Sequence, residues 1–215
     1  SAKKDILIMG WWFSPNLYLR RHKTAEGGLD ESFQLKRVLK NVAQARGVSI
    51  RILIFEKPPF CLDYIDSQGV IDEFKDSDTI EVISHAPSML NKFWSHHSKM
   101  VIVDGTWAYI GGIDLCFGRY DDEKHRITDP HGERHDPQDF YNPQYKEFSK
   151  ESYSIDQTMF ARMGWHDTAI RTASQQETHI AKHIFEWAWN QSSGQGVSEK
   201  NRSLSIEEIK EDKTP

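Results

Sequence analysis

The chain has 215 residues, 38% hydrophobic and 27% charged, which predicts one α/β domain with a sizeable core and argues against disorder. No stretch approaches the roughly 18 consecutive apolar residues of a membrane-spanning helix, and residues 1–4 lack a signal-peptide core. The net charge of -5 argues against broad binding to a phosphate backbone, so nucleic acid is not expected as a partner. Two cysteines, Cys61 and Cys116, favour a reducing compartment. We therefore expect a cytoplasmic protein that contacts membranes only peripherally, although these features leave secretion open.

The first half of the chain alternates strands and helices. Asp5 to Met9 is an apolar run typical of a short strand, Ser32 to Arg46 has the period of an amphipathic helix, and Val48 to Phe55 follows as a buried strand. This order predicts a βαβ unit and hence a parallel or mixed sheet. A weaker helix is expected over Ser67 to Phe74, and a short strand over Ile80 to Ser84.

The second half predicts a hairpin. Met100 to Val103 is rich in β-branched residues and indicates a buried strand, Asp104 and Gly105 form a turn pair, and Trp107 to Ile110 is the returning strand. Residues 118–150 are charged and rich in turn residues. Because the spacing of their acids and histidines matches no zinc or calcium template, a solvated loop is expected there.

The chain ends, by its pattern, with a strand, a helix and a polar tail. Thr168 to Thr172 is the expected strand, and Glu177 to Asn190 is an amphipathic helix. Its predicted buried face consists of Ile180, Ala181, Ile184, Phe185 and Ala188. Residues 191–215 have the composition of a linker.

A candidate site lies at the head of the hairpin. His97 and Lys99 are two residues apart, so strand alternation points them to the same face, and Asp104 follows where the strand ends. A lone histidine near a strand is usually structural, and Lys99 could simply be solvated. The combined spacing H-x-K-x-x-x-x-D, followed by Gly111 and Gly112, favours a functional motif instead.

These residue types suit phosphoryl transfer. A neutral imidazole, with an ordinary pKa of about 6.5, can attack phosphorus and form a phosphoryl-histidine. Lys99 would hold the negative oxygens as charge moves in the transition state. Asp104 has three open roles: it could accept a hydrogen bond from the imidazole, accept one from Lys99, or fix the turn.

The motif and its glycine pair resemble the signature of the phospholipase D superfamily. The continuation from Gly112 to Asp121, GIDLCFGRYD, is similar to the eukaryotic-type phospholipases D. WWFSPNLYLRR, at residues 11–21, resembles the first conserved segment of that family. ARMGWHD, at residues 161–167, resembles its P-R-M-P-W-H-D string, with Ala161 and Gly164 in place of prolines.

The resemblance implies a fold, a division of the chain and a set of site residues. The fold is α/β, a mixed β-sheet flanked by helices on both faces, with residues 1–190 as one catalytic lobe and residues 191–215 as a linker toward a second lobe. His97, Lys99 and Asp104 are the implied catalytic residues, with no metal and no cofactor. Eight residues are expected to bind substrate or support those that do: Trp11, Trp12, Ser14, Gly112, Asp114, Arg119, His166 and Asp167.

The implied reaction is hydrolysis of a phosphatidylcholine-type lipid to phosphatidic acid, with transfer to a primary alcohol as a variant. It needs two such motifs, one histidine as nucleophile and the other as general acid. None of the other nine histidines begins a second motif, so the chain carries half an active site. The expected partners are a membrane surface and a second catalytic lobe, in the same full-length protein or a separate chain. Two alternatives stay open: a single-motif nuclease acting as a homodimer, and a lipid-binding lobe without activity.

Overall fold

The computed structural model describes residues 2–56, 66–85, 97–131, 139–140, 142, 156 and 158–193. Its centre is a six-stranded sheet with the order β3-β2-β1-β4-β5-β6. The strands are β1 (Asp5–Met9), β2 (Ser49–Phe55), β3 (Ile80–His85), β4 (Lys99–Val103), β5 (Trp107–Gly111) and β6 (Ala169–Thr172). The first three run parallel, whereas β4, β5 and β6 each run antiparallel to the neighbour before them in the sheet. The predicted mixed sheet is confirmed.

The first long helix begins later than its periodicity predicts. A short 3-10 helix, η1 (Glu31–Phe33), precedes α1 (Leu35–Arg46), and extended backbone at Gln34 separates them. The Asp30 side chain accepts a hydrogen bond from Ser32 N and caps η1. Gly47 ends α1 in the left-handed conformation, with φ of 63°.

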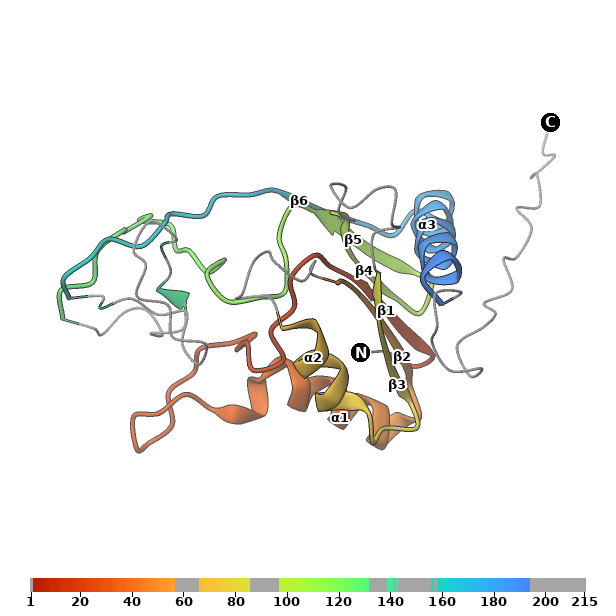
Figure 1. Ribbon diagram of the computed structural model, residues 1–215, viewed down its shortest axis with the longest axis horizontal. Coiled ribbons are helices and arrows are strands. Elements are labelled where there is room, and N and C mark those ends of the chain that lie inside the picture. The colour runs from red at the N-terminus through yellow and green to blue at the C-terminus, as the bar shows by residue number, and fades with distance from the viewer. Residues whose placement is uncertain are drawn as a thin grey trace.

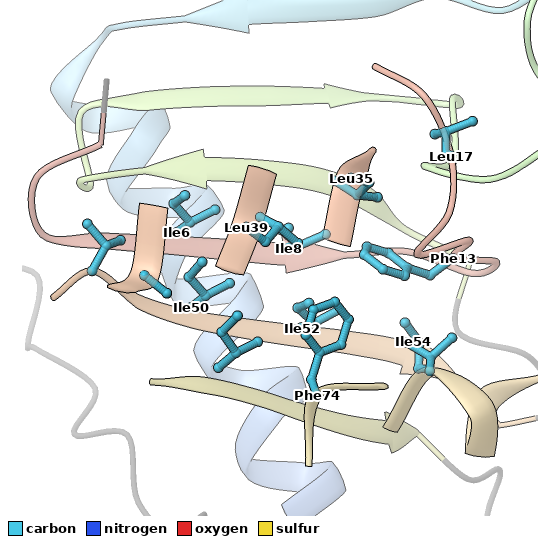
Figure 2. Close-up of a cluster of buried hydrophobic side chains, with 14 of the residues drawn as sticks. Ile6, Ile8, Phe13, Leu17, Leu35, Leu39, Ile50, Ile52, Ile54 and Phe74 are labelled. Carbon is cyan, nitrogen blue, oxygen red and sulfur yellow. The ribbon is translucent and has the colours of Figure 1, made fainter. Parts of the chain in front are cut away.

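Helices cover both faces of the sheet, as expected (Figure 1). On one face α1 and α2 (Ser67–Phe74) pack over the parallel strands, and Figure 2 shows Leu35, Leu39 and Phe74 against the isoleucines of β1 and β2. On the other face α3 (Gln175–Ser193) buries Phe185 and Trp189 against the sheet. No helix in the described ranges is long and apolar enough to cross a membrane.

The buried face of α3 differs from the prediction. Ala181, Phe185 and Ala188 are buried, but Ile180 and Ile184 are 54% and 44% exposed. Apolar residues occupy a wide arc of this helix, so the pattern does not locate the centre of the buried stripe. That stripe includes Thr178 and Ser192, whose hydroxyls donate to the carbonyls of Thr106 and Ala188.

The strand ends form two edges of the sheet, one with long loops and one with a tight turn. At one edge β1, β2, β3 and β5 end and β4 and β6 begin, and we call this the carboxyl edge. The loops after β1 and β5 and before β6 extend from it (Figure 1). At the opposite edge Asp104 and Gly105 have φ of 55° and 61°, and Thr106 N donates to Val103 O at 3.0 Å. This is the tight hairpin turn that the Asp-Gly pair predicts.

The remaining expectations concern loops and the end of the chain. The described residues 118–131 form no helix or strand, in agreement with the predicted loop. Helix α3 continues to Ser193, three residues past its predicted end. The predicted linker from residue 194 onward lies outside the described residues.

Candidate active site

Lys99 is a buried cation at the first position of β4. Its side chain is 6% exposed, and Nζ lies 3.5 Å from Asp114 Oδ2. Nζ also donates to the backbone carbonyl of His97 at 2.9 Å. Burial lowers the pKa of Lys99, and the nearby Asp114 carboxylate opposes that shift.

Asp114 joins three segments of the carboxyl edge. It follows β5, and its Oδ1 accepts hydrogen bonds from Trp11 N at 2.8 Å and Trp12 N at 3.3 Å, just after β1. Its other oxygen faces Lys99 on β4. One carboxylate therefore fixes the ends of three neighbouring strands relative to each other.

His97 lies just before β4, against an aromatic wall. The ring of Trp11 meets its imidazole edge to face at 5.4 Å between centroids and stacks on Phe55 at 5.9 Å. Burial, followed by the charge of Lys99, lowers the pKa of His97, and the charge of Asp114 opposes this. The site thus favours a neutral imidazole whose lone pair is available at neutral pH.

Ser14 and Trp12 connect the loops around the site. Ser14 Oγ accepts from Phe117 N at 3.2 Å, and Ser14 N donates to Leu115 O at 2.9 Å. Trp12 is buried in a cluster with Phe55 and Cys116. Burial strongly raises the pKa of the Cys116 thiol, so this cysteine stays protonated.

The glycine pair lets a distant segment approach the site. A Cβ on Gly111 would lie 2.3 Å from the carbonyl oxygen of Thr168, and one on Gly112 would lie 2.2 Å from the carboxylate of Asp167. Gly112 N donates to Thr168 O at 3.1 Å. The pair is therefore small because the chain entering β6 passes directly over it.

The structure does not place Asp104 with the other motif residues. Its carboxylate lies at the opposite end of β4 and accepts from the backbone N–H groups of Lys3, Lys4 and Asp5, at 2.7 to 3.1 Å. Neither hydrogen bond that would link it to the imidazole or to Lys99 is present. Burial opposes its ionisation, but these three donors outweigh burial and hold the pKa of Asp104 below its ordinary value. The prediction of a catalytic position is corrected: Asp104 fastens the start of the chain to the hairpin turn.

His166, Asp167 and Arg119 line a pocket of about 270 Å³ at the end of the loops. Three acidic residues, His125, Ile113 and Trp165 complete its wall; the acids are Asp121, Asp122 and Glu123. The imidazoles of His125 and His166 lie 5.3 Å apart. His166 and Asp167 thus share a pocket with Arg119, and Asp167 also contributes to the electrostatics of His97. Within the described ranges, no three metal-binding side chains are grouped to hold an ion.

Sequence reasoning missed Arg162 and Trp165 as site residues. Arg162 is buried, and its guanidinium donates to Asp121 Oδ1 at 2.6 Å and to the carbonyls of Arg126 and Tyr120 at 2.8 and 3.4 Å. It therefore sets the course of the loop that forms the pocket. The signal was its place in the string at residues 161–167, but no periodicity shows that an arginine in a loop is buried.

Fold and site together define an α/β protein whose mixed sheet presents a histidine and a buried lysine at its carboxyl edge. Gly111 and Gly112 leave room for the segment that enters β6. The chain belongs to the phospholipase D family, since the family model described as Phospholipase D matches residues 1–214.

Relatives agree with this assignment. The chain is 35% identical to phospholipase D C of Dictyostelium discoideum, 32% identical to a phospholipase D of Phytophthora infestans and 32% identical to phospholipase D zeta 1 of Arabidopsis thaliana. Each alignment covers 88% of this chain but only 11%, 11% and 17% of the relative. The chain therefore spans less than a fifth of the length of these relatives. The solved structure of Nuc from Salmonella typhimurium is 14% identical, and the match covers 89% of this chain and 81% of that chain with a TM-score of 0.45.

Proposed function

We propose that this chain is one catalytic lobe of a phospholipase D, which cleaves a phosphodiester through a phosphoryl-histidine on His97. The observation that carries the proposal is the pairing of a histidine whose pKa is lowered with a buried ammonium that Asp114 holds in place. A neutral imidazole supplies the nucleophile, and a fixed cation stabilises the charge on the phosphoryl oxygens as it moves.

The reaction has two steps. A ring nitrogen of His97 attacks phosphorus, and the P–O bond to the head-group alcohol breaks while a general acid protonates the leaving oxygen. Water then attacks the phosphoryl-histidine, gives its proton to that same group, and releases the phosphomonoester and the imidazole. The sequence contains no second H-x-K-x-x-x-x-D motif, so the general acid is assigned to a second lobe.

The proposed substrate is a phosphatidylcholine-type lipid, which gives phosphatidic acid and free head group at a membrane surface. Support comes from the relatives, all named as phospholipases D, and from the net charge, which does not favour a nucleic acid. A primary alcohol replacing water in the second step would give transfer of the phosphatidyl group.

A substrate whose leaving group departs without a proton allows the attack by His97 to be tested apart from the general acid. We expect the chain alone to form a covalent adduct on His97 with p-nitrophenyl phosphocholine, because p-nitrophenolate needs no general acid, whereas phosphatidylcholine should react only when a second lobe is added. Intact-mass spectrometry and peptide mapping would detect the adduct. His97→Asn should abolish it and leave the circular dichroism spectrum unchanged, while His131→Asn, at an exposed histidine, should retain it.

Four results would contradict the proposal. An adduct that persists in His97→Asn rejects the nucleophile, and full lipid turnover by a chain that native mass spectrometry shows to be a monomer rejects the half site. A stable homodimer that cleaves DNA would favour the single-motif nuclease. Lipid binding with no adduct in the wild-type chain would indicate a lobe without catalysis.

A further inference from the structure

Arg119 lies over two indole rings, those of Trp12 and Trp165. Its guanidinium carbon lies 3.6 Å from the ring centroid of Trp165 and 5.4 Å from that of Trp12. Stacking of this kind fixes the plane of a guanidinium and leaves its N–H groups pointing outward from the rings. The two tryptophans come from the loop after β1 and the loop before β6, so Arg119 also bridges the two walls of the carboxyl edge.

Two of the three guanidinium nitrogens of Arg119 have no acceptor among the described residues. Nε and one terminal nitrogen are buried without a hydrogen-bond partner, and no carboxylate of the described residues forms an ion pair with this side chain. Two nearby carboxylates are occupied, since Asp121 binds Arg162 and Asp114 binds Lys99. Asp122, Glu123 and Asp167 line the same pocket and form no ion pair with Arg119. A guanidinium cannot lose its proton, and buried donors without partners cost free energy. Two donors of this permanent cation are therefore left for an added anion.

Arg119 is linked to the motif residues by its charge, although neither His97 nor Lys99 lines the pocket. It lines the pocket with Trp165 and Asp167. Its positive charge contributes to lowering the pKa of both His97 and Lys99, which places it within electrostatic reach of each.

Lys99 alone has too few donors for a phosphodiester. An ammonium has three N–H groups, and in Lys99 one donates to the His97 carbonyl while Asp114 lies on another side. About one donor therefore remains for two non-bridging phosphoryl oxygens, so a second cationic donor is needed.

We propose that Arg119 is this second donor, a catalytic residue whose unpartnered N–H groups bind a non-bridging oxygen of the phosphoryl group opposite Lys99. The inference rests on the proposed function, because it assumes that the phosphate lies beside His97. The indole rings of Trp12 and Trp165 hold the guanidinium in place before the substrate arrives, which limits the entropy lost on binding.

The test is the binding of inorganic phosphate to the full chain, measured by isothermal titration calorimetry at low salt. Arg119→Gln should weaken phosphate binding by about 10- to 100-fold, the range for hydrogen bonds to charged groups. Arg119→Lys keeps the charge without the planar fork and should fall between Arg119→Gln and wild type. Arg171→Gln is the matched control, because that guanidinium also lies over an indole, Trp107 at 5.0 Å, but does not line the pocket.

Unchanged phosphate affinity in Arg119→Gln would overturn the inference, as would a wild-type chain that binds no phosphate. If Arg119→Gln does not fold, wild-type affinity in Arg119→Lys would overturn the inference. A loss of phosphate affinity in Arg171→Gln as large as in Arg119→Lys would overturn it as well. The adduct on His97 is measured separately, so the inference can fail while the proposed function stands. The converse also holds, since phosphate binding that depends on Arg119 without any adduct would support only the inference.

Discussion

Lys99 and Asp104 belong to one sequence motif, but they lie at the two ends of β4, about 16 Å apart at the usual rise of a strand. The carboxyl edge holds a buried ammonium, a partly desolvated imidazole and a guanidinium with open donors. At the opposite edge, which holds the Asp104–Gly105 turn and which we call the turn edge, the Asp104 carboxylate is saturated by backbone N–H groups.

Within the motif, Lys99 therefore lies at the proposed site of chemistry, whereas Asp104 supports the fold. At the carboxyl edge the charged groups lack some of their partners, which costs stability and leaves capacity to bind a phosphate. At the turn edge every oxygen of Asp104 has a donor, which stabilises the fold and leaves nothing for a substrate. We expect substitutions at the first edge to change function most, and substitutions at the second edge to change stability.

The largest expected effect is at Lys99. Lys99→Gln removes the fixed cation beside His97 and should slow adduct formation with p-nitrophenyl phosphocholine by about 100- to 1,000-fold, as for loss of one oxyanion donor. The rate is measured by release of p-nitrophenolate. Lys182→Gln is the control, because Lys182 also pairs with a carboxylate, Glu186 at 3.7 Å, but on α3. Equal rates in Lys99→Gln and wild type would show that Lys99 is no phosphate clamp.

An intermediate effect is expected at the turn. Asp104→Ala leaves the N–H groups of Lys3, Lys4 and Asp5 without their acceptor and should lower the free energy of unfolding by about 1–3 kcal/mol. Urea denaturation measures this loss, and Asp104→Asn, which keeps one acceptor oxygen, should lose less. Phosphate affinity should stay within about twofold of wild type, because distant sites act independently. A large fall in phosphate affinity with normal stability would return Asp104 to the active site.

The smallest effect is a pH dependence that differs between the two ends. The pKa of His97 is lowered in the folded chain, so the unfolded chain takes up its proton first and stability falls as pH drops below about 6.5. His97→Asn should therefore gain stability relative to wild type over that range. The pKa of Asp104 is also lowered, so its contribution is present above about pH 4 and is lost as pH falls further.

Urea denaturation at a series of pH values separates these two windows. The stability difference between wild type and His97→Asn should change only in the weakly acidic range, and the difference between wild type and Asp104→Asn only in the strongly acidic range. A change for both variants in the same range would contradict the assignment of the two ends.

Much of the fold could be predicted because its strands and helices follow strong local patterns. The apolar run of β2, the Asp-Gly turn and the glycine stop of α1 each determine structure within a few residues. The centre of the buried stripe on α3 could not be predicted, because it depends on which neighbours the helix meets. Thr178 is buried and Ile180 is exposed for that reason.

The candidate site was also predictable only in part from the sequence. His97, Lys99 and Asp114 are identified by spacing and by resemblance, and they meet at one edge because the strands that carry them are neighbours. Spacing left three roles open for Asp104, and the structure places it at the turn, because an extended strand takes the two ends of the motif far apart. The partnerless donors of Arg119 have no sequence signal, since they reflect which carboxylates are already occupied.

The hydrogen bond from Gly112 to Thr168 closes a long insertion at its base. The described residues 113–131 and 158–167 lie between β5 and β6, and Asp139 and Phe140 within the same insertion are buried. Because the closing contact lies next to the sheet, we expect substitutions at exposed positions of the insertion, such as Glu123 and Lys124, to leave the order of the strands unchanged.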